Sequence, residues 1–297
     1  MRRMQTKTSG LRSMWTAGLL LIGSLSLAAP AVGRPLDEVV ASKALRVALY
    51  DDNRPFSETI DGKPVGIDVD IGIALARKLG VEAEIVLRMQ GEDLGDDLRA
   101  NVWRGPLTGG GVGDVMLHVP VDRELASANK EAVIGNAYFD ERVAVALSPA
   151  SPADQFAFAQ FRKRDGDGAP KIGVQLGTVS DYFLLRFDDG RLIDNVRHYI
   201  KPADGVTRFV GGETIAIMGV RSNLESLLTD AGAKASFAEP PMPGIVRQRW
   251  SIGTAVRDNS RDLGYAIGNA LAEMRQSGEL AHIFAAHGVT YVPPPLN

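Results

Sequence analysis

The stretch Gly66-Ile67-Asp68-Val69-Asp70-Ile71 joins a turn to an amphipathic helix, which the spacing of apolar residues predicts to run as far as Leu79. Ile71, Leu75 and Leu79 recur every four positions, so they share one face of that helix. Asp68 belongs to a residue type that caps helices, and we expect it to cap this one. We therefore interpret the aspartates of this stretch as scaffold rather than as ligand contacts.

Strand-like segments lie on both sides of this helix. The segment Ala44–Tyr50 precedes it and residues 82–87 follow it, and both are strand-like. A strand, a helix and a second strand in this order predict an α/β fold with a mainly parallel sheet. Further strands are expected along the chain at residues 114–120, 142–147, 171–178, 215–219 and 250–256.

A secretory signal peptide is predicted over residues 1–33. Four basic residues precede an apolar run over residues 15–28, and the small residues of Ala29-Pro30-Ala31-Val32-Gly33 follow it. The run is shorter than the roughly 20 residues that a membrane-spanning helix needs. We expect cleavage to leave residues 34–297 as an exported, soluble periplasmic protein.

The composition narrows the classes of function. The 297 residues contain no cysteine, which excludes a disulfide and a lipid-anchored N-terminal cysteine. Removal of residues 1–33 takes away four basic side chains and no acidic ones, so the formal charge changes from −3 to −7. A chain of this charge is a poor partner for nucleic acid. We expect a monomer with one large or two medium hydrophobic cores.

Four motifs together resemble the family 3 periplasmic solute-binding proteins, over nearly all of the mature chain. They are Pro55-Phe56, the Gly66 segment, the strand and turn at residues 173–178, and the closing helix over residues 278–289. The resemblance implies a type II periplasmic binding protein of two lobes joined by two crossings. It also implies capture of a solute for an ABC permease, without enzymatic activity and without a cofactor.

The lobes are expected at residues 34–145 together with 252–297, and at residues 146–251. In the family, the hinge closes around a ligand between the lobes. Three elements clamp an amino acid there: an arginine for its carboxylate, a Gly-Thr turn at a helix start, and an acidic residue for its ammonium group.

Two of these elements have candidates in this chain. Gly177 and Thr178 form the Gly-Thr turn, and with Ser180 they would bind an anion through the free N–H groups of a helix start. Arg123 could hold a carboxylate through a bidentate fork. The other interpretation of Arg123 is a solvated surface arginine that pairs with Asp122 or Glu124.

The third element is missing at its expected place, because residues 217–221 contain no carboxylate. Without it, a bound ammonium group would stay unpaired at a cost of several kcal/mol. Arg221 would instead favour an anionic ligand such as an organic acid, unless it faces water at a helix start. The predicted solute is therefore polar or anionic.

The remaining candidate contacts belong to the first lobe. Phe56 and Tyr138 are expected to supply apolar walls, and His118 a polar contact beside Arg123. Tyr50 is a further candidate ligand contact. No metal-ligand spacing occurs among the histidines, and we predict no metal site.

Two alternatives to solute capture remain. Met218-Gly219 and the stretch from Asp114 to Pro120 resemble the J-type accessory proteins of quinoprotein methanol dehydrogenases, which share the fold but act on a dehydrogenase. The fold also carries periplasmic dehydratases and peptidoglycan lyases. His118 is the only acid-base candidate for such an enzyme near the predicted cleft.

Overall fold

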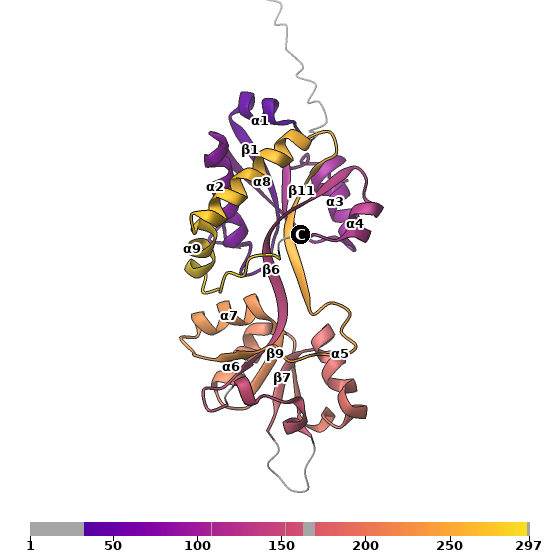
Figure 1. The fold of residues 1–297 in the computed structure, drawn as a ribbon, viewed down its shortest axis with the longest axis vertical. Coiled ribbons are helices and arrows are strands. Elements are labelled where there is room, and N and C mark those ends of the chain that lie inside the picture. Colours follow the sequence, from indigo (N-terminus) through magenta and orange to yellow (C-terminus); the bar gives the residue numbers. More distant parts are fainter. Residues whose placement is uncertain (1–32, 108, 152, 163–169, 296–297) are drawn as a thin grey trace, which may run out of the picture. The chain divides into compact units, whose positions relative to one another are not determined.

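The computed structural model describes residues 33–107, 109–151, 153–162 and 170–295, so the predicted signal peptide lies outside the described residues except for Gly33. Helices and strands alternate along this part of the chain (Figure 1). The strands are β1 (Ala44–Tyr50), β2 (Glu58–Ile60), β3 (Lys63–Val65), β4 (Glu82–Arg88), β5 (Val115–Pro120), β6 (Ala132–Leu147), β7 (Ile172–Gln175), β8 (Val196–Tyr199), β9 (Ala216–Val220), β10 (Ser236–Ala238) and β11 (Arg249–Arg257). The α-helices are α1 (Leu36–Ser42), α2 (Ile67–Leu79), α3 (Leu94–Leu98), α4 (Arg123–Ala128), α5 (Val179–Arg186), α6 (Pro202–Val210), α7 (Arg221–Asp230), α8 (Arg261–Gln276) and α9 (Glu279–Ala286).

One nine-stranded sheet has the order β4-β1-β5-β11-β6-β9-β7-β8, with β10 paired to β6. Strand β1 is parallel to β4 and β5, and β7 is parallel to β8 and β9. Every antiparallel pair of this sheet involves β6 or β11. These two strands run side by side between two lobes, so the expected α/β fold with two crossings is confirmed (Figure 1).

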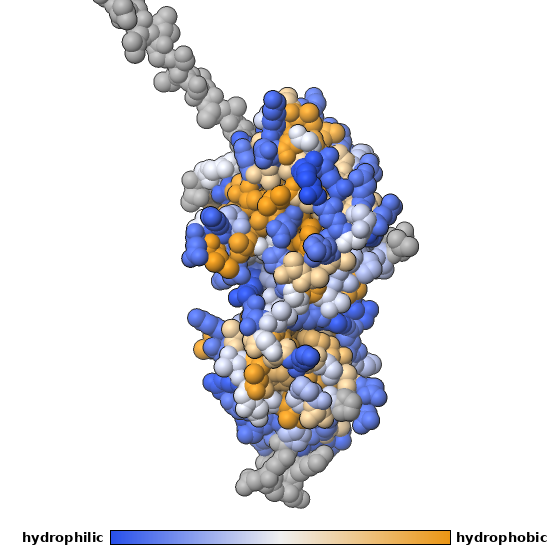
Figure 2. Space-filling view, turned by 90° about the vertical axis from the view of Figure 1, so that its left-hand side faces the viewer, coloured by the Kyte–Doolittle hydropathy of each residue, from blue (hydrophilic) through white to orange (hydrophobic). Residues whose placement is uncertain are grey.

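Each lobe has its own hydrophobic core. In the first lobe, α2, α8 and α9 pack on one side of β1 and β5, and a smaller cluster beside Leu98 and Val102 covers the other side. In the second lobe, two clusters that include Phe161 and Phe209 enclose β7 and β9. Trp250 packs against the main cluster of both lobes. Figure 2 shows mostly hydrophilic residues where the lobes meet on the side of α7 and α9.

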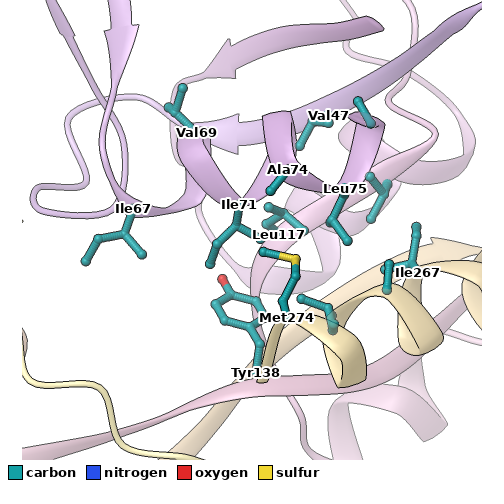
Figure 3. Packing of buried hydrophobic residues seen from close by; sticks show 14 of the residues in the cluster. Val47, Ile67, Val69, Ile71, Ala74, Leu75, Leu117, Tyr138, Ile267 and Met274 are labelled. Atoms are coloured by element: carbon teal, nitrogen blue, oxygen red, sulfur yellow. The ribbon is translucent and has the colours of Figure 1, made fainter. Parts of the chain in front are cut away.

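Helix α2 forms as its spacing predicts and packs its apolar face into the first core. Ile67, Ile71 and Leu75 are fully buried among side chains from the sheet, from α8 and from β6 (Figure 3). Gly80 ends the helix in the left-handed conformation, with φ of 72°, which glycine adopts without strain.

The expected cap of this helix is wrong. Helix α2 begins after Gly66 without a side-chain cap, and Asp68 lies within its first turn, fully buried. Its carboxylate instead contacts two side chains from distant strands. The predicted helix start was correct to within two residues, but the role of Asp68 depends on tertiary contacts.

Candidate functional site

A cavity of about 520 Å³ lies between the lobes, a size suited to a small molecule. Larger hollows lie elsewhere. One of about 730 Å³ beside α5 is lined by second-lobe residues alone, and one of about 650 Å³ beside Arg142, Arg249 and Pro293 is also lined from both lobes. We take the cavity of about 520 Å³ as the candidate site because the starts of α5 and α7 meet the side chains of His118 and Glu141 there. Its lining includes Asp52, Asn53, Arg54, Phe56, Gln90, His118, Glu141, Gln175, Thr178, Val179, Ser180, Tyr199, Met218, Val220, Ser222, Asn223 and Trp250.

The first-lobe wall of this cavity is formed by Phe56 and His118. Their ring centroids lie 4.2 Å apart, and Phe56 is almost completely buried. The His118 Nδ1 atom lies 3.0 Å from an Asp68 carboxylate oxygen. The His118 ring is therefore held by a buried carboxylate.

Tyr138 and Tyr50 lie behind the wall rather than in it. The Tyr138 hydroxyl donates to Asp68 at 2.6 Å and accepts from the His118 backbone N–H at 3.1 Å. Burial, and then the charge of Asp68, raise the pKa of Tyr138 well above its usual value. Tyr50 is buried on another side, where its hydroxyl donates to Asp97 at 2.7 Å. Neither tyrosine lines the cavity.

The second-lobe wall is the start of α5. Thr178 caps this helix by accepting the Asp181 N–H, and Asp181 accepts the Gly177 N–H at 2.8 Å in return. These reciprocal contacts resemble a capping box. Thr178 and Ser180 line the cavity, whereas Gly177 lies just outside it with its N–H already used.

A buried carboxylate of the cavity belongs to Glu141 on β6, the strand that pairs with β9. It lines the cavity, is 2% exposed, and accepts hydrogen bonds from the Ser222 hydroxyl and from the Arg142 N–H at 2.8 Å. Val143 of β6 pairs with Val220, the last residue of β9. Glu141 therefore lies opposite Ser222, in the first turn of α7. The sequence signal was the charged run at residues 140–142 inside an otherwise mostly apolar strand.

Burial dominates the electrostatics of Glu141. It raises the pKa of this carboxyl from 4.5, against the opposing hydrogen bonds from Ser222 and Arg142. The proton therefore stays on Glu141 to a higher pH than on an exposed glutamate. A positively charged group beside it would favour the ionised form.

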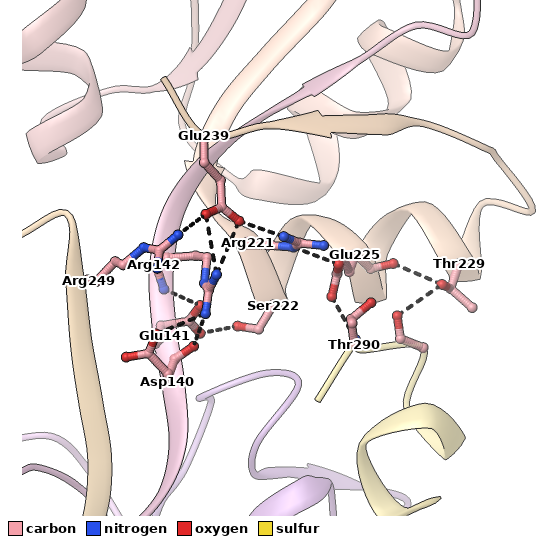
Figure 4. Close-up of polar contacts among 11 residues, drawn as sticks. Asp140, Glu141, Arg142, Arg221, Ser222, Glu225, Thr229, Glu239, Arg249 and Thr290 are labelled. Carbon is pink, nitrogen blue, oxygen red and sulfur yellow. Dashed lines mark hydrogen bonds and ion pairs between the residues drawn. The ribbon is translucent and has the colours of Figure 1, made fainter. Parts of the chain in front are cut away.

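The two arginines of the sequence prediction do not reach the cavity. Arg123 is exposed at the first position of α4, and the neighbouring Asp122 pairs with Arg247 at 2.8 Å. Arg221 pairs with Glu225 at 2.8 Å and with Glu239 at 2.6 Å, and it does not line the cavity (Figure 4).

Glu239 connects the second lobe to both crossing strands. Its carboxylate forms ion pairs with Arg142 of β6, Arg249 of β11 and Arg221 of α7 (Figure 4). Burial raises its pKa, but the Arg221 hydrogen bond and the charges of the arginines outweigh burial, and the net pKa is lowered from 4.5. Two glutamates beside the same hinge thus have pKa shifts of opposite direction.

In the described part of the chain, histidine, aspartate and glutamate side chains nowhere gather in a group of three or more that could hold a metal ion. None of the helices described here has both the length and the apolar character that crossing a bilayer requires.

No model of a known protein family matches the sequence, and no curated protein matches it. Solved structures do match. An ancestral cationic amino acid solute-binding protein has a TM-score of 0.64 at 21% identity, over 85% of this chain and 99% of that chain. An amino acid ABC transporter substrate-binding protein from Streptococcus pneumoniae, bound to L-arginine, has a TM-score of 0.53 at 18% identity, over 86% and 99%.

An ancestral cyclohexadienyl dehydratase matches with a TM-score of 0.53 at 20% identity, over 86% of this chain and 96% of that chain. Binding proteins and an enzyme thus share this architecture, and fold alone does not decide function. The resemblance to the J-type accessory branch is not confirmed. The chain has the fold of the type II periplasmic binding proteins.

Proposed function

We propose that this protein captures a small polar solute reversibly between its lobes and delivers it to an ABC-type importer. The observation that carries the proposal is the cavity of about 520 Å³, in which polar groups from both lobes and from the crossing strand β6 converge. A site divided between two lobes can close around its ligand and open again. No group transfer is needed for this role, and we propose that the protein is not an enzyme.

The contacts that we assign to the solute differ in part from the sequence prediction. Phe56 and His118 contact it from the first lobe, Thr178 and Ser180 from the second, and Glu141 from the hinge. Tyr138 and Gly177 support these groups from behind. Arg123, Arg221 and Tyr50 have no place in the proposed site.

The solute is proposed to carry both a basic and an acidic end, as an amino acid does. Glu141 suits an ammonium group, because a positive charge beside a buried carboxyl is favourable. The start of α5 suits a carboxylate. The amino acids named for the matched binding proteins agree with this choice. A purely anionic solute loses the support of Arg123 and Arg221.

The cellular setting follows from the same proposal. We propose that residues 1–33 direct export to a periplasm and are removed, and that the lobes comprise residues 34–145 with 252–297, and residues 146–251.

The alternative role is that of an accessory protein of a quinoprotein dehydrogenase. A modified or closed cleft is expected for that role, and a cavity with converging polar groups does not favour it.

A thermal-shift screen tests the proposal. The purified protein is screened against amino acids, organic acids, sugars, polyamines and metal ions, and a ligand at 100 times its Kd should add about 2.7 kcal/mol of stability. Val220→Trp, which fills the cavity, should abolish the shift. The control Val246→Trp, at a site 95% exposed and outside this cavity, should keep it.

Two results would contradict the proposal. One is a folded protein that responds to no member of the panel. The other is a shift that Val220→Trp leaves intact. Recovery of the bound solute unchanged after prolonged incubation would separate capture from catalysis.

A further inference from the structure

We infer that Asp68 and Tyr138 are positioning residues for His118, which hold its Nδ1 hydrogen on Asp68 and leave Nε2 as the atom that accepts a hydrogen bond from the solute. The tautomer is a property of the protein alone. The last step, the solute contact, rests on the proposed function. The inference specifies the solute further, since the group that meets His118 must be a donor such as a hydroxyl or an N–H.

Three groups form a closed hydrogen-bonded triangle. Tyr138 donates to one Asp68 oxygen at 2.6 Å, and the His118 Nδ1 contacts the other at 3.0 Å. The His118 N–H completes the triangle by donating to the Tyr138 hydroxyl at 3.1 Å. Both the ring and the backbone of His118 are therefore held by the same pair of residues.

The charge of Asp68 decides where the ring hydrogen lies. Asp68 is 0% exposed, and a buried carboxylate is costly unless donors satisfy its oxygens. A carboxylate only accepts, so Nδ1 must carry a hydrogen to bond with it. In a neutral imidazole the second nitrogen is then an acceptor. Since His118 lines the cavity, Nε2 is its remaining group for a ligand.

The backbone of His118 agrees with a positioned residue. Its φ of 61° lies in the left-handed region, which is uncommon for residues other than glycine. Such conformations cost free energy and persist where surrounding contacts determine them. Here the contacts are the Tyr138 hydroxyl and the Phe56 ring, 4.2 Å away between centroids.

The chain contains a matched control. In the second lobe, His198 contacts Asp181 through its other nitrogen, Nε2, at 2.8 Å, and Asp181 is also buried. The His198 side chain is 34% exposed and does not line the cavity. The two pairs therefore predict opposite tautomers within one protein.

The test is NMR of the full protein labelled with 15N-histidine, recorded at about pH 8 without any solute. Wild-type His118 should carry its hydrogen on Nδ1 and His198 on Nε2. In Asp68→Asn, the amide can donate to Nδ1, so the His118 hydrogen should move to Nε2 while the His198 signals stay unchanged. His118→Gln assigns the signals.

The inference is overturned if wild-type His118 carries its hydrogen on Nε2 alone, or if Asp68→Asn leaves the tautomer unchanged. Should Asp68→Asn fail to fold, Tyr138→Phe serves instead. It should leave the hydrogen on Nδ1 but speed the amide exchange of His118 at least tenfold, because that N–H loses its acceptor. Unchanged exchange would count against the inference.

The solute contact is tested separately. With a ligand from the thermal-shift screen, Asp68→Asn should weaken binding at least tenfold, and the ligand's donor group should be required for tight binding. A screen without hits would remove the proposed function but not the tautomer result. An altered tautomer with unchanged affinity would remove Nε2 from the solute site.

Discussion

The two walls of the cavity are built in different ways. In the first lobe, His118 is held by Asp68, 50 positions away in the sequence, and Phe56 lies against Gly66 and His118. In the second lobe, Thr178 is held within one turn by Asp181 and Gln175. The first wall depends on tertiary packing and the second on a local helix start.

Because of this difference, substitutions in the first wall should destabilise the protein more than substitutions in the second. A change in the first wall disturbs buried partners from several elements, and their loss leaves groups unsatisfied. A change in the second wall removes one local contact and leaves the rest of α5 in place. Matched substitutions in the two walls should therefore differ in their effect on stability.

The largest difference is expected between two glycines. Gly66→Ala places a methyl group against the Phe56 carbonyl, at a φ of 133°, so the turn that seats Phe56 must shift. We expect a loss of about 3 kcal/mol. Gly177→Ala meets no atom within 4 Å and has only its φ of 78° to strain it, which costs about 1 kcal/mol. Urea unfolding measures both, and equal losses would contradict the comparison.

Two tyrosines give the next largest difference. Tyr138→Phe leaves an Asp68 oxygen and the His118 N–H without their partner, at a cost of about 2 kcal/mol. Tyr199→Phe in the second wall removes a hydroxyl of a cavity-lining residue that makes no hydrogen bond among the described residues, so less than about 0.5 kcal/mol is expected without solute. Thermal unfolding of both variants checks this. A greater loss of stability in Tyr199→Phe than in Tyr138→Phe would contradict the proposed difference between the two walls.

Loss of the α5 cap should have a smaller effect. Thr178→Ala removes the acceptor of the Asp181 N–H and should cost about 1 kcal/mol. Thr178→Ser keeps the oxygen and should cost much less. Chemical unfolding compares the two variants, and equal costs would show that the threonine methyl group, rather than the cap, matters.

The smallest effects concern pH at the hinge. Because the pKa of Glu141 is raised, its contribution to folding is fully present below pH 4.5 and is lost as the pH rises through the raised pKa. The pKa of Glu239 is lowered, so its contribution is present above pH 4.5 and is lost as the pH falls through the lowered pKa.

The two glutamine variants should therefore show opposite trends in the free energy of unfolding measured against pH. Relative to wild type, Glu141→Gln should gain stability as the pH rises above 4.5. Glu239→Gln should lose stability, relative to wild type, as the pH rises towards 4.5. If both variants followed the same trend, that result would contradict either the burial of Glu141 or the arginine contacts of Glu239.

The difference between local contacts and contacts distant in sequence explains which features the sequence could predict. The period of α2 and the alternation of strands and helices are local patterns, and both were correct. The Asp68 contact with His118 and the Ser222 contact with Glu141 join residues 50 and 81 positions apart. No local pattern encodes such pairs, so the cavity's buried acid and its positioned histidine became visible only in the fold.

Arg123 and Arg221 show the limit of an argument from residue type alone. Their residue type suits an anion, but a side chain's partner depends on what the fold places beside it. Arg221 is paired with two glutamates, and Arg123 points from an exposed helix start.

The most direct test of the central claim is hydrogen exchange of the protein with and without a ligand from the screen. One solute held by both walls should slow exchange in β5 near His118 and at the start of α5 together. Slowing confined to the hollow beside α5, or to one wall alone, would contradict the account of a solute captured between the lobes.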